Sequence, residues 1–215
     1  MTPSGLRVVG LGNAMRGDDA VGLIVARHLR ELLPAADVIE RSGEPAGLLE
    51  ALGEGAEAVV LVDAVLSGGL PGEVHRLDAS DVALPIAAGA STHGLGLAET
   101  IELGRALGRL PARLLVYGIE GRSLELGAPL SPEVASAAVV VAAEIRQLLE
   151  EAERTSIADA GPDSGGRGHR PDAGSRGSIA LQSTCVARAP GADSGPGSST
   201  APAPAPAPAP AAAGV

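Results

Sequence analysis

Two short, almost wholly apolar runs, Ala58–Asp63 and Arg113–Gly118, most constrain the fold of this chain. Each has about the length of one β-strand, and continuous apolar character is typical of a strand that is buried on both faces. A third short apolar run covers Leu6–Leu11. Strands of this kind occur in parallel sheets that are covered by helices on both sides, so the runs indicate an α/β protein.

Segments with helical periodicity separate these strands. Between the runs Leu6–Leu11 and Ala58–Asp63, apolar residues recur at helical spacing from Val21 to Leu32. Weaker strands are expected at Asp37–Glu40 and at Glu73–Leu77, whose alternation is typical of an edge strand. Three more helices are expected: one that begins at Pro45, one that covers Gly94–Leu107 and one that begins at Ser131-Pro132. We therefore predict a three-layer α/β/α fold with a twisted, mostly parallel sheet of about five strands.

Composition divides the chain near residue 154. Residues 1–154 carry 12 Arg and 22 Asp or Glu, whereas residues 155–215 carry four basic and four acidic residues and end in an Ala-Pro repeat. A segment with so few large apolar residues cannot bury a core. We predict one α/β domain at 1–154 and a disordered Pro/Ala/Gly/Ser-rich tail at 155–215, in which Cys185 and His169 are incidental.

Residue usage excludes several classes of function. All 16 basic residues are Arg, which excludes a Schiff-base lysine and a P-loop. One aromatic residue, Tyr117, and a net charge of −10 argue against nucleic-acid binding. The single cysteine excludes an intrachain disulfide. The chain has neither an apolar stretch of about twenty residues nor the basic and apolar start of a signal peptide, so we expect a cytoplasmic protein that does not cross a membrane.

Candidate site residues follow the expected strands. Asp19 follows the first strand, Asp63 ends the run Ala58–Val62, and His93 precedes a helix. Ligands bind beyond the carboxyl ends of parallel strands, where these side chains would converge. A carboxylate after a buried strand must be solvated, paired or bound to a cation. Two carboxylates and one imidazole form an incomplete ligand set for a transition metal, which leaves coordination positions open to a partner.

Other interpretations of the same residues remain open. Asp18 and Asp19 could cap the helix that follows them, a role for which one acid suffices. The glycines near Gly10 begin like a dinucleotide-binding fingerprint, but Met15 stands where its third glycine would be. His28 belongs to an apolar helix stripe, which predicts a core or interface position, and His75 is expected to be exposed. No Ser-His-Asp order or Gly-x-Ser-x-Gly motif suggests a covalent nucleophile.

Between Leu6 and Leu149 the chain resembles the nickel–iron hydrogenase maturation proteases. The resemblance rests on five motifs in order: Gly10-Leu-Gly-Asn13 with Gly17-Asp-Asp-Ala-Val-Gly22, Val60-Leu-Val-Asp-Ala64, Ser91-Thr-His93, Val116-Tyr-Gly-Ile-Glu120 and Leu130-Ser-Pro132. Members of that family remove a C-terminal peptide from the hydrogenase large subunit. The resemblance implies that Asp19, Asp63 and His93 contact nickel supplied by the precursor and form the catalytic site. It also implies the large-subunit precursor as partner, and we expect a monomer.

One segment departs from the family pattern. Many members have Asp-Gly-Gly-Thr where this chain has Ser42-Gly-Glu-Pro45, which bears on the class of hydrogenase that is processed. Two alternatives share the same three residues: a non-proteolytic, nickel-binding hydrogenase assembly factor, and a peptidase of this fold that acts on another substrate. Whether the metal or a side chain activates the water is left open by the sequence.

Overall fold

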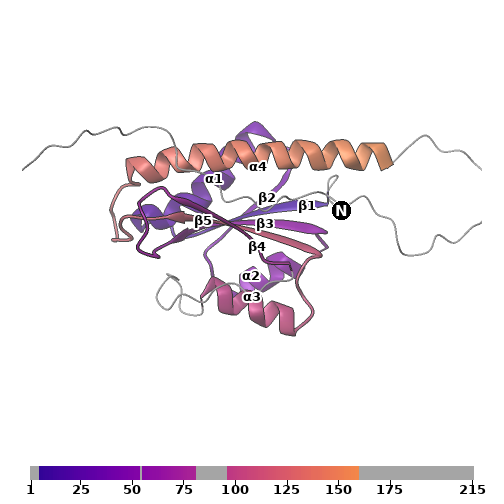
Figure 1. The fold of residues 1–215 in the computed structure, drawn as a ribbon, viewed down its shortest axis with the longest axis horizontal. Helices are drawn as coiled ribbons and strands as arrows, with labels where there is room; N and C mark the ends of the chain where they lie inside the picture. The colour runs from indigo at the N-terminus through magenta and orange to yellow at the C-terminus, as the bar shows by residue number, and fades with distance from the viewer. Residues whose placement is uncertain (1–4, 54, 81–95, 160–215) are drawn as a thin grey trace, which may run out of the picture.

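The computed structural model describes residues 5–53, 55–80 and 96–159 and contains one five-stranded sheet with helices on both faces (Figure 1). The order of the strands is β2-β1-β3-β5-β4, and only β4 runs antiparallel to its neighbour. The predicted α/β fold is confirmed. The elements are β1 (Leu6–Leu11), the 3-10 helix η1 (Gly17–Ala20), α1 (Val21–Leu32), β2 (Asp37–Arg41), α2 (Pro45–Gly53), β3 (Ala58–Val65), β4 (Val74–Asp78), α3 (Leu97–Ala106), β5 (Arg113–Glu120) and α4 (Pro132–Asp159).

Two apolar clusters lie on the two sides of the sheet. Helices α1 and α4 cover one face, and α2 and α3 cover the other (Figure 1). The central strand β3 supplies both clusters, because Val60 and Val62 point toward α1 and α4 whereas Val59 and Leu61 point toward α2 and α3. Burial on both faces explains why the sequence of this strand is a continuous apolar run.

Helix α1 lies unusually close to the sheet because of Gly22. A Cβ atom at Gly22 would lie 2.3 Å from the carbonyl oxygens of both Leu11 and Val62. The buried side of α1 includes Val25 and Leu29. His28, which the apolar pattern placed in the core or an interface, is exposed to solvent. The core position is therefore wrong for His28, and the interface position stays a prediction.

The one aromatic residue joins three elements. Tyr117 of β5 is 1% exposed, and its hydroxyl donates a hydrogen bond to Glu144 Oε2 of α4 at 3.2 Å. Arg76 of the edge strand β4 lies over the ring, 5.7 Å from its centre. Burial raises the pKa of Tyr117 above its ordinary value of 10.0, Arg76 opposes the shift, and Glu144 adds to it. The ring therefore stays a neutral hydrogen-bond donor.

The order of the strands creates a switch point between β1 and β3. From β1 the chain crosses through α1 on one face to β2, and from β2 it returns through α2 on the other face to β3. The neighbouring strands β1 and β3 thus connect to helices on opposite faces, and ligand sites of open α/β sheets lie at such a point. Helix α4 continues to Asp159, so the first five residues of the predicted tail at 155–215 are helical, and the rest lies outside the described residues. None of the described helices is long and apolar enough to cross a membrane.

Candidate active site

Asp19 and Asp63 meet at the switch point. Asp19 lies in η1, the first element after β1, and is 0% exposed; Asp63 lies near the carboxyl end of β3 and is 6% exposed. Gly12 allows η1 to fold back over the end of β1, since it has a φ of 139° and a Cβ atom there would lie 1.8 Å from the Asp19 carbonyl oxygen. The predicted convergence of Asp19 and Asp63 is consistent with this geometry.

Burial and the neighbouring charge of Asp19 both act on the ionisation of Asp63. Burial raises the pKa of Asp63 from 3.8 to about 7, the hydrogen bond from Ala64 N to Asp63 Oδ1 at 2.9 Å opposes this shift, and the charge of Asp19 increases it. The guanidinium of Arg16 lies 3.9 Å from Asp19 Oδ2. At neutral pH Asp63 is therefore near the midpoint of its titration, and a cation at this site would favour the ionised carboxylate.

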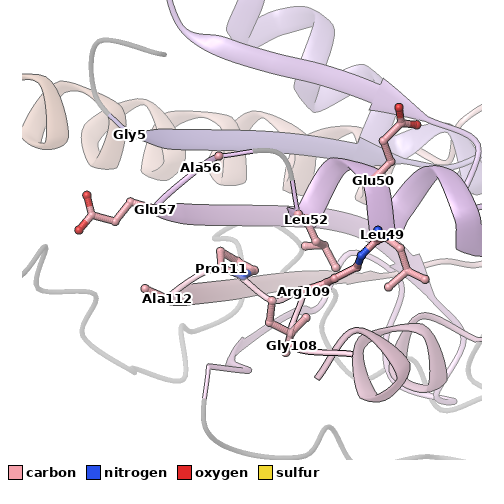
Figure 2. A pocket seen from close by; sticks show the side chains of 13 residues that line it. Gly5, Leu49, Glu50, Leu52, Ala56, Glu57, Gly108, Arg109, Pro111 and Ala112 are labelled. Atoms are coloured by element: carbon pink, nitrogen blue, oxygen red, sulfur yellow. The ribbon is translucent and has the colours of Figure 1, made fainter. Parts of the chain in front are cut away.

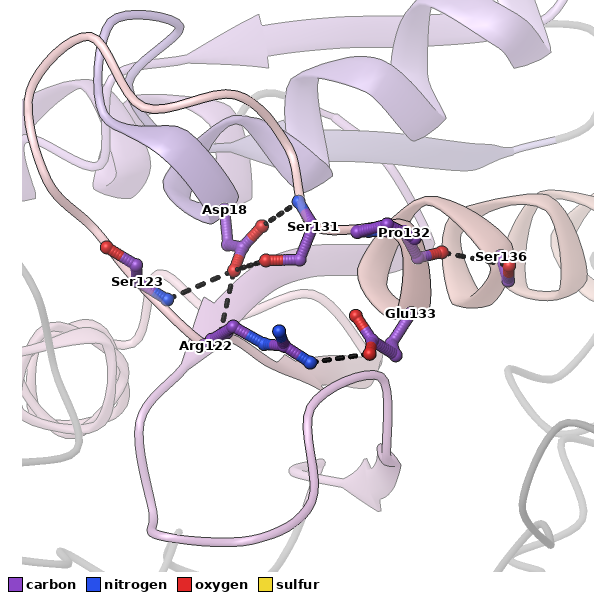
Figure 3. Close-up of polar contacts among 7 residues, drawn as sticks. All are labelled: Asp18, Arg122, Ser123, Ser131, Pro132, Glu133 and Ser136. Atoms are coloured by element: carbon purple, nitrogen blue, oxygen red, sulfur yellow. Dashed lines mark hydrogen bonds and ion pairs between the residues drawn. The ribbon is translucent and has the colours of Figure 1, made fainter. Parts of the chain in front are cut away.

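Asp18, the neighbour of Asp19, has a structural role (Figure 3). Its side chain is 0% exposed and accepts four hydrogen bonds: from Ser131 N at 2.6 Å, Ser131 Oγ at 2.7 Å, Arg122 N at 2.8 Å and Ser123 N at 3.1 Å. Burial alone would raise the pKa of Asp18, but these donors together hold it below the ordinary value of 3.8. Asp18 thereby ties η1 to the loop between β5 and α4.

The interpretation as a helix cap does not hold for Asp18, whose printed partners all lie outside the helix that follows it. Arg16 and Ala20 stand at the N-cap positions of η1 and α1, and neither side chain makes a capping hydrogen bond. The first helical bond of α4 runs from Ala135 N to the Ser131 carbonyl, while the Ser131 hydroxyl is used by Asp18. The carboxylate of Asp18 therefore satisfies donors of a distant loop.

A third buried acid, Glu120, holds the loop between β3 and β4. It is 1% exposed at the end of β5, and its Oε1 accepts hydrogen bonds from the backbone amides of Ser67 at 2.8 Å, Gly68 at 2.9 Å and Gly69 at 3.1 Å. Its Oε2 accepts a bond from Ser67 Oγ at 2.7 Å. No role for Glu120 was predicted from the sequence. The only local indication was that Glu120, like Asp63, stands at the end of an apolar run.

His75 lies in the same row of the sheet as Asp63. Asp63 pairs with Gly118 of β5, and Gly118 pairs with His75 of β4, so the side chains of Asp63 and His75 share the face toward α2 and α3. The His75 side chain is 37% exposed, and its Nε2 lies 3.6 Å from Glu120 Oε2. His75 is thus half-buried beside a carboxylate, whereas the sequence analysis expected it to be exposed.

The third candidate ligand, His93, lies outside the described residues. Its role stays a prediction. Within the described ranges, no group of three His, Cys, Asp or Glu side chains is arranged to hold a metal ion. Asp19 and Asp63 thus form a two-carboxylate site in the part of the chain that the structure describes.

A cavity of about 740 Å³ lies at the opposite edge of the sheet (Figure 2). Its lining includes Gly5, Glu57 and Ala112, which directly precede β1, β3 and β5, and Arg109. The cavity is therefore at the amino ends of the strands, whereas the buried acids are at the carboxyl ends. It shares no residue with the candidate site.

Comparisons with known proteins agree with the fold and the motifs. The model of the hydrogenase maturation protease family matches residues 25–160. The Hydrogenase 2 maturation protease of Escherichia coli (strain K12) is 31% identical over 131 residues, which cover 59% of this chain and 79% of that protein.

Solved structures give the same result. The NiFe hydrogenase maturation protease HybD from Thermococcus kodakarensis has a TM-score of 0.54 at 31% identity, covering 67% of this chain and 97% of that one. The hydrogenase maturating endopeptidase HybD from E. coli also has a TM-score of 0.54, at 26% identity, covering 68% and 92%. The family match extends over more than half of the chain, and the sheet with its helices is shared. The chain therefore belongs to the hydrogenase maturation protease family and is a peptidase.

Proposed function

We propose that this peptidase removes a C-terminal peptide from the nickel-loaded precursor of a nickel–iron hydrogenase large subunit, and that Asp19, Asp63 and His93 contact the nickel that the precursor carries. Family membership supports the reaction. The observation that supports metal recognition is the pair of buried carboxylates at the switch point, where burial and, to a smaller extent, the charge of Asp19 raise the pKa of Asp63.

The buried pair is suited to a cation that arrives with the substrate. Taking carboxylates out of water is unfavourable unless a positive charge or donors compensate. Nickel held by the precursor would supply that charge and would draw the proton from Asp63. Two carboxylates leave coordination positions for the precursor's own ligands, so binding would test whether the metal is loaded. The same contact would place the nearby scissile peptide, whose carbonyl a metal can polarise.

His93 would supply the third donor. The neutral imidazole of a histidine is the form that binds a metal. In this proposal the carboxylates neutralise charge, and the imidazole adds a nitrogen ligand of the kind that nickel prefers.

The test is incubation of the full chain with nickel-loaded and nickel-free precursor, followed by mass spectrometry of the precursor. We expect loss of a C-terminal peptide only from the loaded form, and no loss with Asp63→Asn or His93→Ala. His28→Ala is the matched control, because His28 is exposed on α1, and it should process normally. Nickel-dependent binding without any mass loss would instead indicate an assembly factor. Equal cleavage of both precursor forms would contradict metal recognition.

A further inference from the structure

Four large apolar side chains are exposed in the loops around the candidate site. Met15 is 64% exposed before η1, Leu66 and Leu70 are 37% and 68% exposed between β3 and β4, and Leu126 is 79% exposed between β5 and α4. We call these four residues the apolar rim. Each of the three loops leaves the carboxyl end of a parallel strand, at the edge of the sheet where Asp19 and Asp63 lie.

The three loops contact one another. Gly127 N donates a hydrogen bond to the Met15 carbonyl at 2.8 Å, which places Leu126 beside the loop of Met15. A Cβ atom on Gly121 would lie 3.5 Å from Leu66 Cδ2 and 3.3 Å from Asp18 Cβ, so the start of the β3–β4 loop adjoins η1 and the end of β5. The apolar rim therefore belongs to one continuous surface around the buried acids.

Buried carboxylates hold these loops in place. Asp18 joins η1 to the segment from Arg122 to Ser131. Glu120 accepts hydrogen bonds from three backbone amides and one hydroxyl of Ser67–Gly69. Hydrogen bonds to charged, buried groups are among the stronger ones in proteins. Loops fixed in this way lose little backbone conformational entropy when a partner covers them.

We propose that the apolar rim is the docking surface for the precursor, and that it contacts apolar side chains that flank the scissile bond. This inference rests on the proposed function: a peptide bond that reaches Asp19 and Asp63 brings its own protein against the surrounding loops. Isolated exposed apolar residues need no explanation, but four that ring one acidic site on fixed loops favour a protein partner. The acids would recognise the metal, and the rim would supply apolar contact area and determine the affinity for the precursor.

The test compares two triple variants of the full chain in cleavage of nickel-loaded precursor at varied concentration. The rim variant is Met15→Ser/Leu70→Ser/Leu126→Ser. The control variant is Leu103→Ser/Leu107→Ser/Val139→Ser, which changes three other exposed apolar residues on α3, just after α3 and on α4. We expect the rim variant to raise KM about tenfold or more with kcat within about twofold of wild type. The control should change neither constant by more than about twofold.

A third variant separates apolar contact from loop structure. Met15→Leu/Leu70→Met/Leu126→Met keeps the side chains apolar and should retain the wild-type KM. An unchanged KM in the serine variant, or an equal rise in the control, overturns the docking surface while the proposed function stands. A wild-type chain that leaves the loaded precursor intact overturns both.

Discussion

Asp18 and Asp63 are both buried, but their surroundings contain very different numbers of hydrogen-bond donors. Asp18 accepts four hydrogen bonds, whereas Asp63 accepts one from Ala64 N among the described residues and faces the charge of Asp19. Hydrogen-bond donors lower the pKa of Asp18, whereas burial raises the pKa of Asp63. The same change, Asp to Asn, is therefore expected to affect stability in opposite directions at the two positions.

Asp63→Asn should stabilise the fold at neutral pH. The carboxyl has a pKa of 3.8 in the unfolded chain and about 7 in the folded one. As pH rises from about 4 to 7, the unfolded chain loses this proton first, so the free energy of unfolding of the wild type falls. Asn keeps the shape without this penalty, and the gain at pH 7 is up to about 4 kcal/mol. Urea unfolding at several pH values measures it; parallel pH dependences of the two proteins would contradict the prediction.

Asp18→Asn should destabilise the fold. In the wild type, backbone amides donate to the Asp18 carboxylate, and the side-chain amide of Asn would turn donor hydrogens toward them. The expected loss in the free energy of unfolding at pH 7 is about 2–4 kcal/mol. The pKa of Asp18 is lowered by folding, so the stabilisation is present above pH 3.8 and is lost as pH falls through the folded pKa.

Ser136→Ala is the matched control for Asp18→Asn. The Ser136 hydroxyl donates to the Pro132 carbonyl on the exposed side of α4, so urea unfolding should show little change. Equal effects of the two substitutions would mean that the Asp18 contacts add nothing to stability.

Sequence distance explains which acids could be predicted. Asp63 was found because a carboxylate directly after an apolar run is a local signal. The partners of Asp18 are 104 to 113 residues away in the sequence, and those of Glu120 are 51 to 53 residues away. Such contacts form only when the strands have been ordered in the sheet, so periodicity and spacing could not reveal them.

At the level of elements, apolar runs predicted the centres of strands better than their ends. The expected strands at 58–63 and 113–118 each continue for two more residues, to Val65 and Glu120. Backbone pairing between β3 and β5 extends both strands past the polar Asp63. The helical pattern placed α1 correctly, but the buried side of the helix is formed by Val21–Leu23, Val25, Ala26 and Leu29, so that His28 is exposed.

Gly22→Ala should be strongly destabilising. The added methyl would meet the backbone oxygens of Leu11 and Val62 at 2.3 Å, and neither can move without displacing its strand. We expect a loss of about 3 kcal/mol or more in the free energy of unfolding, or failure to fold. Gly47→Ala in α2 is the control, since its nearest neighbour would be Arg41 Cδ at 3.7 Å, and it should gain about 0.5–1 kcal/mol of helix propensity. Similar Tm values for both variants would contradict the close approach.

At the level of the whole molecule, the core that the described residues form ends within α4. The two apolar clusters are formed by elements between β1 and α4, and their last member is Ala152. The predicted domain end at 154 was placed where composition changes, but α4 continues to Asp159. Composition cannot detect a helix end that lies beyond the last buried residue.

Deleting residues 160–215 should leave Tm within about 3 °C of the full chain, because the sequence of this segment has few large apolar residues and the described core ends at Ala152. A deletion that begins at Leu149 removes two buried side chains of α4, Leu149 and Ala152, and should lower Tm by several degrees or more. Calorimetry of the two truncated chains beside the full protein measures both effects. A large drop after the shorter deletion would show that the tail contributes to the core.

Tyr117 makes the protein its own spectroscopic reporter. It is the one tyrosine of a chain without tryptophan or phenylalanine, so ultraviolet absorption and intrinsic fluorescence near 300 nm come from a single ring. That ring touches Arg76 of β4 and Glu144 of α4 at once. Its emission therefore records whether the edge strand and the last helix are both seated on the sheet, and no added label is needed.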